Sequence, residues 1–163
     1  MNDRLIALVQ QQAQNELSNF LTYEIMFLDS EQMGFFGLAK FCQSQAKGEK
    51  EHHDTIISYM NDANIPSFPI ISQIREPYTL SMLPILAGIL KLEQKTTEEI
   101  NAICACALDN ADFQTFASFH TLALEQVEEI KKITDILAKY RQRSATGDPS
   151  SAELDIDLYI GGL

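Results

Sequence analysis

Apolar residues recur three and four positions apart along four long stretches of the chain, as they do on the buried face of an α-helix. The pattern predicts helices over about 3–30, 35–63, 81–109 and 112–142. In the first stretch the apolar face carries Val9, Ala13, Phe20, Tyr23 and Phe27. Four amphipathic helices of this kind form a four-helix bundle, so the predicted fold class is all-α.

The links between the predicted helices differ in length. Those around 32–34 and 109–112 are short, which predicts antiparallel hairpins of the first two and the last two helices. Between the second and third helices lie the seventeen residues Asn64–Leu80, which include Pro66, Pro69 and Pro77. Fully extended, they reach about 56 Å, farther than the roughly 40 Å of one helix. We therefore expect one long crossover that starts the third helix at the far end of the bundle.

The end of the chain is expected to form a separate element. Gly147–Pro149 ends the fourth helix, and a polar residue such as Asp148 could cap a short fifth helix. However, apolar and polar residues alternate from Leu154 to Ile160, which is the period of a strand. A short helix that contacts other subunits is the preferred interpretation. The chain then divides into a bundle over 1–143 and a tail over 144–163.

Composition and charge indicate one acidic domain. The 163 residues are 45% apolar, enough for a core, and carry a net charge of −11. This charge repels nucleic-acid phosphates and concentrates cations near the surface. No apolar run approaches the ~20 residues of a membrane span, and no signal peptide opens the chain. We therefore expect neither a nucleic acid nor a membrane as a partner.

The cysteines indicate a reducing compartment. The chain has an odd number of cysteines, and all three lie on predicted helices: Cys42, Cys104 and Cys106. Cys104 and Cys106 are two residues apart, so on a helix they point away from each other. Reduced thiols and a cytoplasmic location are expected.

Each predicted helix carries polar residues inside its apolar stripe, close to its midpoint. Glu49 and His52 are three residues apart, so they share a helical face and can hold one metal ion. Packing of the four helices brings these polar residues to the same depth in the bundle. Their four carboxylates would repel each other there unless a cation binds between them. Oxygen and nitrogen ligands suit Fe²⁺, Mn²⁺ or Zn²⁺. The other members are Glu16 on the first helix, Glu93 on the third, and Gln126 and Glu129 on the fourth.

Several of these and nearby residues also have simpler explanations. Gln126 could be a hydrogen-bonded amide of the core, and Tyr23 a core residue whose hydroxyl reaches the site. Glu125 and Glu128 are expected to point to a flank of the bundle or to solvent. His53 and His120 are expected to have no functional role.

Across residues 1–143 the chain resembles the prokaryotic non-haem ferritins, a family of bundles with one long crossover. The resemblance lies in Glu16, Tyr23, Glu49-x-x-His52, Glu93, Gln126 and Glu129. It implies that these residues form a catalytic ferroxidase centre. One iron would be held by Glu16, Glu49 and His52, and a second by Glu49 and Glu93 with Gln126 and Glu129 nearby. It also implies oxidation of Fe²⁺ by O₂ or peroxide and storage of ferric mineral in a shell of twenty-four subunits.

The chain departs from related patterns at a few positions. Many bacterial ferritins have a glutamate directly before the helix-two glutamate, which helps to hold a third iron, and here that residue is Gly48. A third site through Glu125 and Glu128 should therefore be weak or absent. Alternatively, Gly48 could serve close packing against a neighbouring helix. Lys50 replaces the haem-ligating methionine of bacterioferritins, and Gln126-x-x-Glu129 replaces their second Glu-x-x-His, so no haem is expected.

Three other functions compete with iron storage. A peroxide-reducing, rubrerythrin-like di-iron enzyme lacks support because the chain has no Cys-x-x-Cys pair and only one Glu-x-x-His. A DNA-protecting mini-ferritin is disfavoured because its iron ligands lie between subunits. A non-enzymatic bundle that buffers divalent metals would use the same ligands without turnover.

Overall fold

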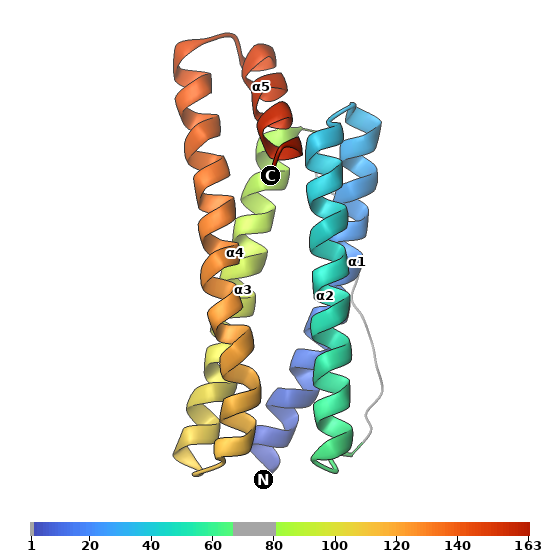
Figure 1. Cartoon of the computed structure of the whole chain (residues 1–163), viewed down its shortest axis with the longest axis vertical. Coiled ribbons are helices and arrows are strands. Elements are labelled where there is room, and N and C mark those ends of the chain that lie inside the picture. The colour runs from blue at the N-terminus through green and yellow to red at the C-terminus, as the bar shows by residue number, and fades with distance from the viewer. Residues whose placement is uncertain (1, 67–80) are drawn as a thin grey trace.

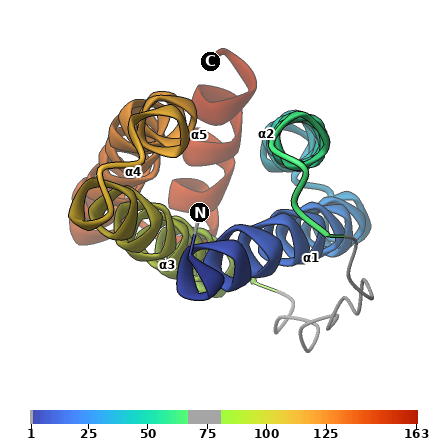
Figure 2. The ribbon, with the colours of Figure 1, turned by 90° about the horizontal axis from the view of Figure 1, so that it is seen from below.

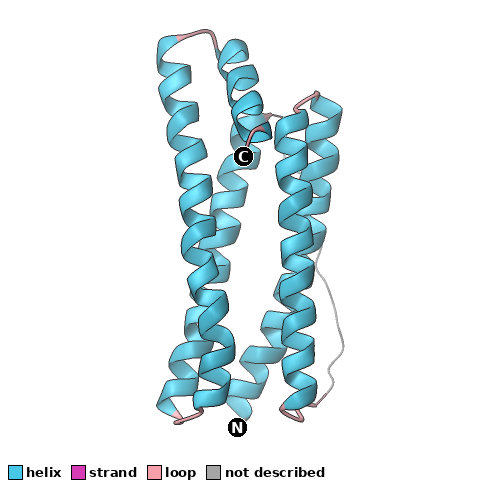
Figure 3. Ribbon diagram, viewed as in Figure 1, coloured by secondary structure: helices cyan, strands magenta, loops and turns pink. Residues whose placement is uncertain are grey.

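The computed structural model describes residues 2–66 and 81–163, where it contains five helices and no strand (Figure 3). None of these helices is both long and apolar enough to cross a membrane. The all-α fold class is confirmed, with helix ends within four residues of the prediction. The helices are α1 (Asp3–Met33), α2 (Phe36–Asp62), α3 (Met82–Asp109), α4 (Phe113–Thr146) and α5 (Pro149–Gly161).

A glycine forms the turn of the hairpin between α1 and α2. Gly34 follows Met33 with a φ of 79°, a left-handed conformation that favours glycine. Its N–H donates to the carbonyl of Glu31 (3.0 Å), and the N–H of Phe35 donates to that of Ser30 (2.9 Å). These bonds satisfy two of the last carbonyls of α1. The chain therefore reverses direction at once, and α2 packs antiparallel to α1.

The order of the helices in space agrees with one long crossover. In Figure 1, α2 ends at the lower end of the bundle and α3 begins at the upper end, so both run the same way. The predicted crossover is Asn64–Leu80, of which 67–80 lie outside the described residues. Seen from below in Figure 2, α1 lies beside both α2 and α3, and α3 pairs with α4.

The tail is a helix, and the strand alternative is wrong. Asp148 caps α5 by accepting the N–H of Ser151 (3.2 Å), and Pro149 occupies the first helical position. Near the upper end of the bundle, α5 packs against both α2 and α4 of its own chain.

The outer side of α5 carries two exposed leucines. Leu154 and Leu158 are exposed, whereas Ile156 and Ile160 are buried. The predicted contact of this element with other subunits stays a prediction. The division of the chain at residue 143 also stays a prediction. In the structure α4 continues past this point to Thr146.

Two apolar clusters fill the interior, one toward each end of the bundle. On α1 the lower cluster reaches Ala13 and the upper cluster begins at Tyr23. On α2, which runs the other way, the upper cluster reaches Ala46 and the lower cluster begins at Ile56. Between the clusters the buried residues are polar. We call the following residues the polar belt: Gln12, Glu16, Asn19, Glu49, Glu93, Thr96 and Gln126.

Candidate metal centre

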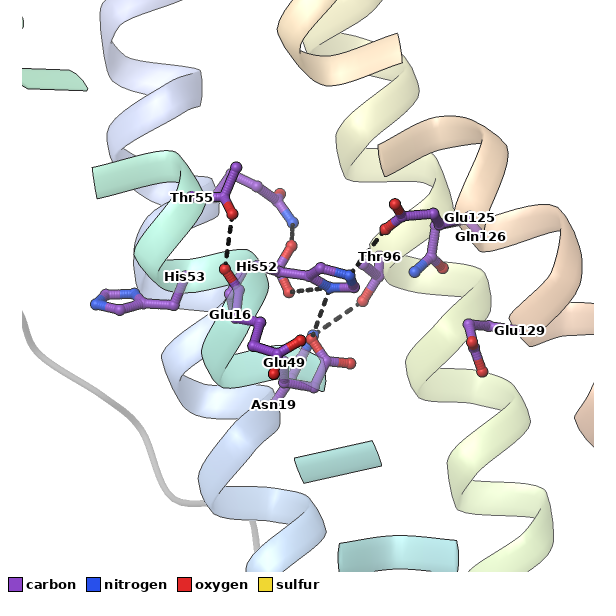
Figure 4. Close-up of polar contacts among 12 residues, drawn as sticks. Glu16, Asn19, Glu49, His52, His53, Thr55, Thr96, Glu125, Gln126 and Glu129 are labelled. Carbon is purple, nitrogen blue, oxygen red and sulfur yellow. Dashed lines mark hydrogen bonds and ion pairs between the residues drawn. The ribbon is translucent and has the colours of Figure 1, made fainter. Parts of the chain in front are cut away.

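Glu16, Glu49 and His52 converge at the polar belt (Figure 4). Each offers one ligand atom, and the three atoms lie within 4.8 Å of one another. His52 Nδ1 is 3.9 Å from Glu16 Oε2 and 3.8 Å from Glu49 Oε2. Both His52 Nδ1 and Glu16 Oε2 are buried without a hydrogen-bond partner. Because buried polar atoms normally have a partner, this geometry fits a cation held between the three groups.

Helix geometry explains how the three residues meet. Three residues span nearly one turn, so α2 presents Glu49 and His52 on one face. Glu16 comes from α1, which packs directly against α2. The structure thus brings together three of the side chains that the sequence predicts for this site, and their role as metal ligands stays a prediction.

Neighbouring amides orient the two carboxylates. Gln12 donates to Glu16 Oε1 (2.7 Å), and Asn19 donates to Glu49 Oε2 (3.5 Å) and to Thr96 Oγ1 (3.0 Å). Sequence reasoning missed Gln12, Asn19 and Thr96. The signal was present in the spacing, because Gln12 and Asn19 lie four residues before and three after Glu16 on its buried face.

Glu93 and its partners form the other half of the belt. The hydroxyl of Tyr23 donates to Glu93 Oε1, so Tyr23 reaches the site. With its amide nitrogen turned toward Glu93, Gln126 donates to Glu93 Oε2 (3.2 Å) and to Thr97 Oγ1 (3.1 Å). Gln126 is therefore hydrogen-bonded, as the simpler explanation expects, and its place beside a metal ion stays a prediction.

Glu129 does not join Glu16, Glu49 and His52 (Figure 4). Its Oε2 accepts the amide of Gln45 (2.8 Å), and its Oε1 accepts the ammonium of Lys132 (2.7 Å). Both oxygens are thus engaged away from the convergence point. Gln45 and Lys132 were not identified from the sequence, because neither lies in an apolar stripe.

Burial shifts the belt carboxyls toward their protonated form. It raises the pKa of Glu16 well above the usual range, and the nearby Glu49 raises it further. Burial likewise raises the pKa of Glu49 and that of Glu93 to about 7. The pKa of Tyr23 is raised by burial and by the neighbouring Glu93. A divalent cation would replace these protons as the counter-charge.

Gly48 faces open space rather than a helix. A Cβ placed on it would meet nothing within 4 Å, so the close-packing explanation is wrong. Gly48 lines a cavity of about 70 Å³ together with Gln45, Glu49, His52, Gln126 and Glu129.

The remaining predicted residues lie outside the convergence point. Glu128 is exposed, and Glu125 is half-exposed but places Oε2 3.1 Å from His52 Nε2. His53 is a satisfied core residue whose Nδ1 lies 2.7 Å from the carbonyl of Ala13. His120 is exposed and stacks on Phe116.

Comparison with known structures gives the fold. The chain superposes on an open pore ferritin from Archaeoglobus fulgidus with a TM-score of 0.87 and 19% identity, covering 99% of this chain and 98% of the other. It also superposes on a PmFTN variant soaked in iron, with a TM-score of 0.85 and 25% identity over 96% and 98% of the two chains.

Comparison of sequences gives the family. Residues 6–143 match the ferritin-like domain. A bacterial non-heme ferritin of Escherichia coli is 26% identical, covering 91% of this chain and 90% of the relative. A probable bacterial non-heme ferritin-like protein of Haemophilus influenzae is also 26% identical, covering 100% and 97%. The chain therefore belongs to the ferritin-like domain family, with the prokaryotic non-haem ferritins as its relatives.

Proposed function

We propose that this protein oxidises Fe²⁺ to Fe³⁺ at a di-iron centre inside the bundle and stores the ferric product in an oligomeric shell. The observation that carries this proposal is the pair of unpartnered buried atoms, His52 Nδ1 and Glu16 Oε2, beside Glu49. These two atoms lack hydrogen-bond partners, whereas the neighbouring carboxylates and amides of the polar belt are hydrogen-bonded.

The residues divide between two positions for the substrate iron. Glu16, Glu49 and His52 hold the first ion, and Glu49 with Glu93 holds the second. Gln126 and Glu129 lie near the second position, and Tyr23 supports Glu93 through its hydroxyl. A shared Glu49 suits two ions ~3.5–4 Å apart, a usual spacing of two-metal sites.

The reaction needs no covalent nucleophile from the protein. Each Fe²⁺ loses one electron, and two electrons with two protons reduce O₂ to H₂O₂, or reduce H₂O₂ to two waters. Anionic oxygen ligands favour Fe³⁺ over Fe²⁺ and so promote the loss of the electron. No haem takes part in this scheme.

Storage requires more than one chain. A single bundle of 18.3 kDa has no room for mineral, so we propose a homo-oligomeric shell of about twenty-four copies in the cytoplasm, with no nucleic-acid or membrane partner. The three free cysteines fit a reducing compartment. Light scattering should give a particle more than twenty times the mass of the chain, and a stable monomer or dimer would exclude storage.

One observation favours a second candidate, a bundle that buffers divalent metals without turnover. Glu129 is engaged by Lys132 and Gln45, which leaves the second position with fewer ligands than the first. A protein of this kind would bind one Zn²⁺ or Mn²⁺ per chain tightly and would not accelerate iron oxidation.

Aerobic addition of Fe²⁺ to the metal-free protein, followed by ferric absorbance, distinguishes these functions. The parent should oxidise iron rapidly, and Glu16→Ala and His52→Ala should both be severely slowed while remaining folded. Glu51→Ala is the control, because Glu51 lies on α2 but is exposed and pairs with Lys47. Parent-like rates in both site variants would show that the centre is elsewhere. No acceleration by the parent would favour buffering, and peroxide consumption without retained mineral would favour a non-storage di-iron oxidase or peroxidase.

A further inference from the structure

The outer nitrogen of the His52 ring has a partner from another helix. Nε2 lies 3.1 Å from Oε2 of Glu125 on α4, whereas Nδ1 faces inward toward Glu16 and Glu49 (Figure 4). We propose that Glu125 is a positioning residue: it accepts the Nε2–H of His52 and thereby presents the Nδ1 lone pair to the first metal ion. This inference rests on the metal centre proposed above.

The distances around the ring favour one tautomer. A neutral imidazole has one N–H donor and one lone pair. Nδ1 is 3.8 Å or more from the nearest carboxylate oxygens, too far for a hydrogen bond, whereas Nε2 is within hydrogen-bonding distance of a carboxylate. With the proton on Nδ1, the Nε2 lone pair would face the negative charge of Glu125. The proton therefore belongs on Nε2, which leaves Nδ1 able to bind a metal.

Gly48 explains why Glu125 is available for this role. A third iron would need a carboxylate at position 48 to join Glu125, and Gly48 offers only open space. Glu125 is consequently free to bond the His52 ring. The contact also ties α4 to α2 at the edge of the site, where Glu125 is 49% exposed and His52 20%.

The expected effect follows from other protein metal sites. Partners of this kind fix the orientation of a ligating histidine and increase its basicity, and their loss usually lowers metal affinity 10–100-fold. Loss of Glu125 should therefore lower the affinity for the first ion, even though Glu125 does not contact that ion. If Glu125 instead served a third metal site, its loss would lower the affinity only for an ion that binds later and less tightly.

Anaerobic calorimetric titration of the metal-free, assembled protein with Zn²⁺ tests this difference without turnover. Glu125→Ala should lower the affinity for the tightest ion roughly 10–100-fold. Glu125→Gln should recover part of the loss, because its amide oxygen can still accept the Nε2–H. Asp135→Ala is the control, since it removes an exposed carboxylate of α4 that pairs only with Lys131 among the described residues.

A spectroscopic measurement separates positioning from a general loss of structure. The chain has three histidines, so the ¹⁵N solid-state NMR spectrum of histidine-labelled, metal-free protein is simple to assign with a His52→Ala sample. The parent should carry the His52 proton on Nε2, and Glu125→Ala should shift it partly to Nδ1.

Three results would overturn the assignment. In the first, Glu125→Ala binds the tightest Zn²⁺ as the parent does, or loses only a weaker ion; the metal centre would then stand and Glu125 would have another role. In the second, His52 of the parent carries its proton on Nδ1. In the third, the parent binds no Zn²⁺ tightly, which would refute the metal centre itself along with the role of Glu125.

Discussion

Asp157 and Gly37 lock α5 onto the beginning of α2. The carboxylate of Asp157 accepts the N–H of Gly37 (3.1 Å) and that of Leu38 (2.8 Å). The N-cap residue of α2, Phe35, provides no side-chain cap, so Asp157 satisfies helix N–H groups that would otherwise be unpaired. A negative charge is also favourable at this helix end. A Cβ on Gly37 would lie 1.9 Å from the main-chain oxygen of Asp157, so only glycine allows this approach.

Substitution at Gly37 should therefore destabilise the docked α5. Gly37→Ala must displace the α5 backbone, and we expect a loss of ~1–3 kcal/mol in the free energy of unfolding. Asp157→Ala should cost about 0.5–2 kcal/mol through the lost cap. Chemical denaturation measures both, and limited proteolysis should cut the C-terminal residues of each variant faster.

Gly48→Ala on the same helix provides the matched control. Its Cβ enters open space, and alanine is favoured over glycine within a helix by about 1 kcal/mol, so this variant should be more stable than the parent. Equal stability of Gly37→Ala and the parent would show that α5 is not held as described.

Release of Glu129 from Lys132 should strengthen the second metal position. Lys132→Met removes a nearby positive charge and leaves Glu129 Oε1 free to turn toward Glu93. An exposed ion pair contributes at most about 1 kcal/mol, so the affinity for the second ion should rise up to about fivefold. Anaerobic Co²⁺ titration measures the change. Lys131→Met, which breaks the exposed pair with Asp135, should leave the affinity unchanged. Weaker binding of the second ion in Lys132→Met would mean that the ion pair between Glu129 and Lys132 supports the site.

The metal-free protein should lose stability as pH rises through neutrality. Glu49 and Glu93 have pKa values of about 7 in the fold, against about 4.3 in an unfolded chain. Between these values the folded state binds more protons than the unfolded state, so protons stabilise it. This contribution is complete below about pH 4 and is lost as pH rises through about 7.

Thermal unfolding with a metal chelator should show a lower midpoint at about pH 8 than at about pH 5.5. Glu49→Gln should reduce this difference, because one raised pKa is removed. A midpoint that is unchanged or higher at the alkaline pH would contradict the protonated state of the belt.

A carboxylate at position 48 should create a third metal position. Gly48→Glu places a third acidic group near Glu125 and Glu128, and the open space around Gly48 can accept the side chain. In crystals soaked briefly in Fe²⁺, the variant should show a stronger third iron peak than the parent. A fully occupied third iron in the unmodified protein would mean that other ligands replace the missing carboxylate.

The sequence predicted what depends on position along a helix. The polar belt was visible because Glu16 and Glu49 interrupt apolar stripes near their midpoints, and the long crossover sets which midpoints meet. By the same logic Glu-x-x-His placed Glu49 and His52 on one face. These features follow from the 3.6-residue period and from chain length alone.

Features that depend on competing contacts were not predictable. Glu129 lies in the expected stripe, but Lys132 and Gln45 offer its carboxylate closer partners than the centre does. The open space at Gly48 is set by the separation of helices, which no local pattern encodes. In α5 the strand-like alternation is overridden by the Asp148 cap and by the contact of Asp157 with α2.

The location of iron in crystals soaked in Fe²⁺ tests the central claim most directly. Anomalous scattering should reveal two strong peaks ~3.5–4 Å apart, one between Glu16, Glu49 and His52 and the other between Glu49 and Glu93. In His52→Ala crystals the first peak should be lost or greatly weakened. Iron bound only at surface carboxylates, with none in the polar belt, would contradict the proposed centre.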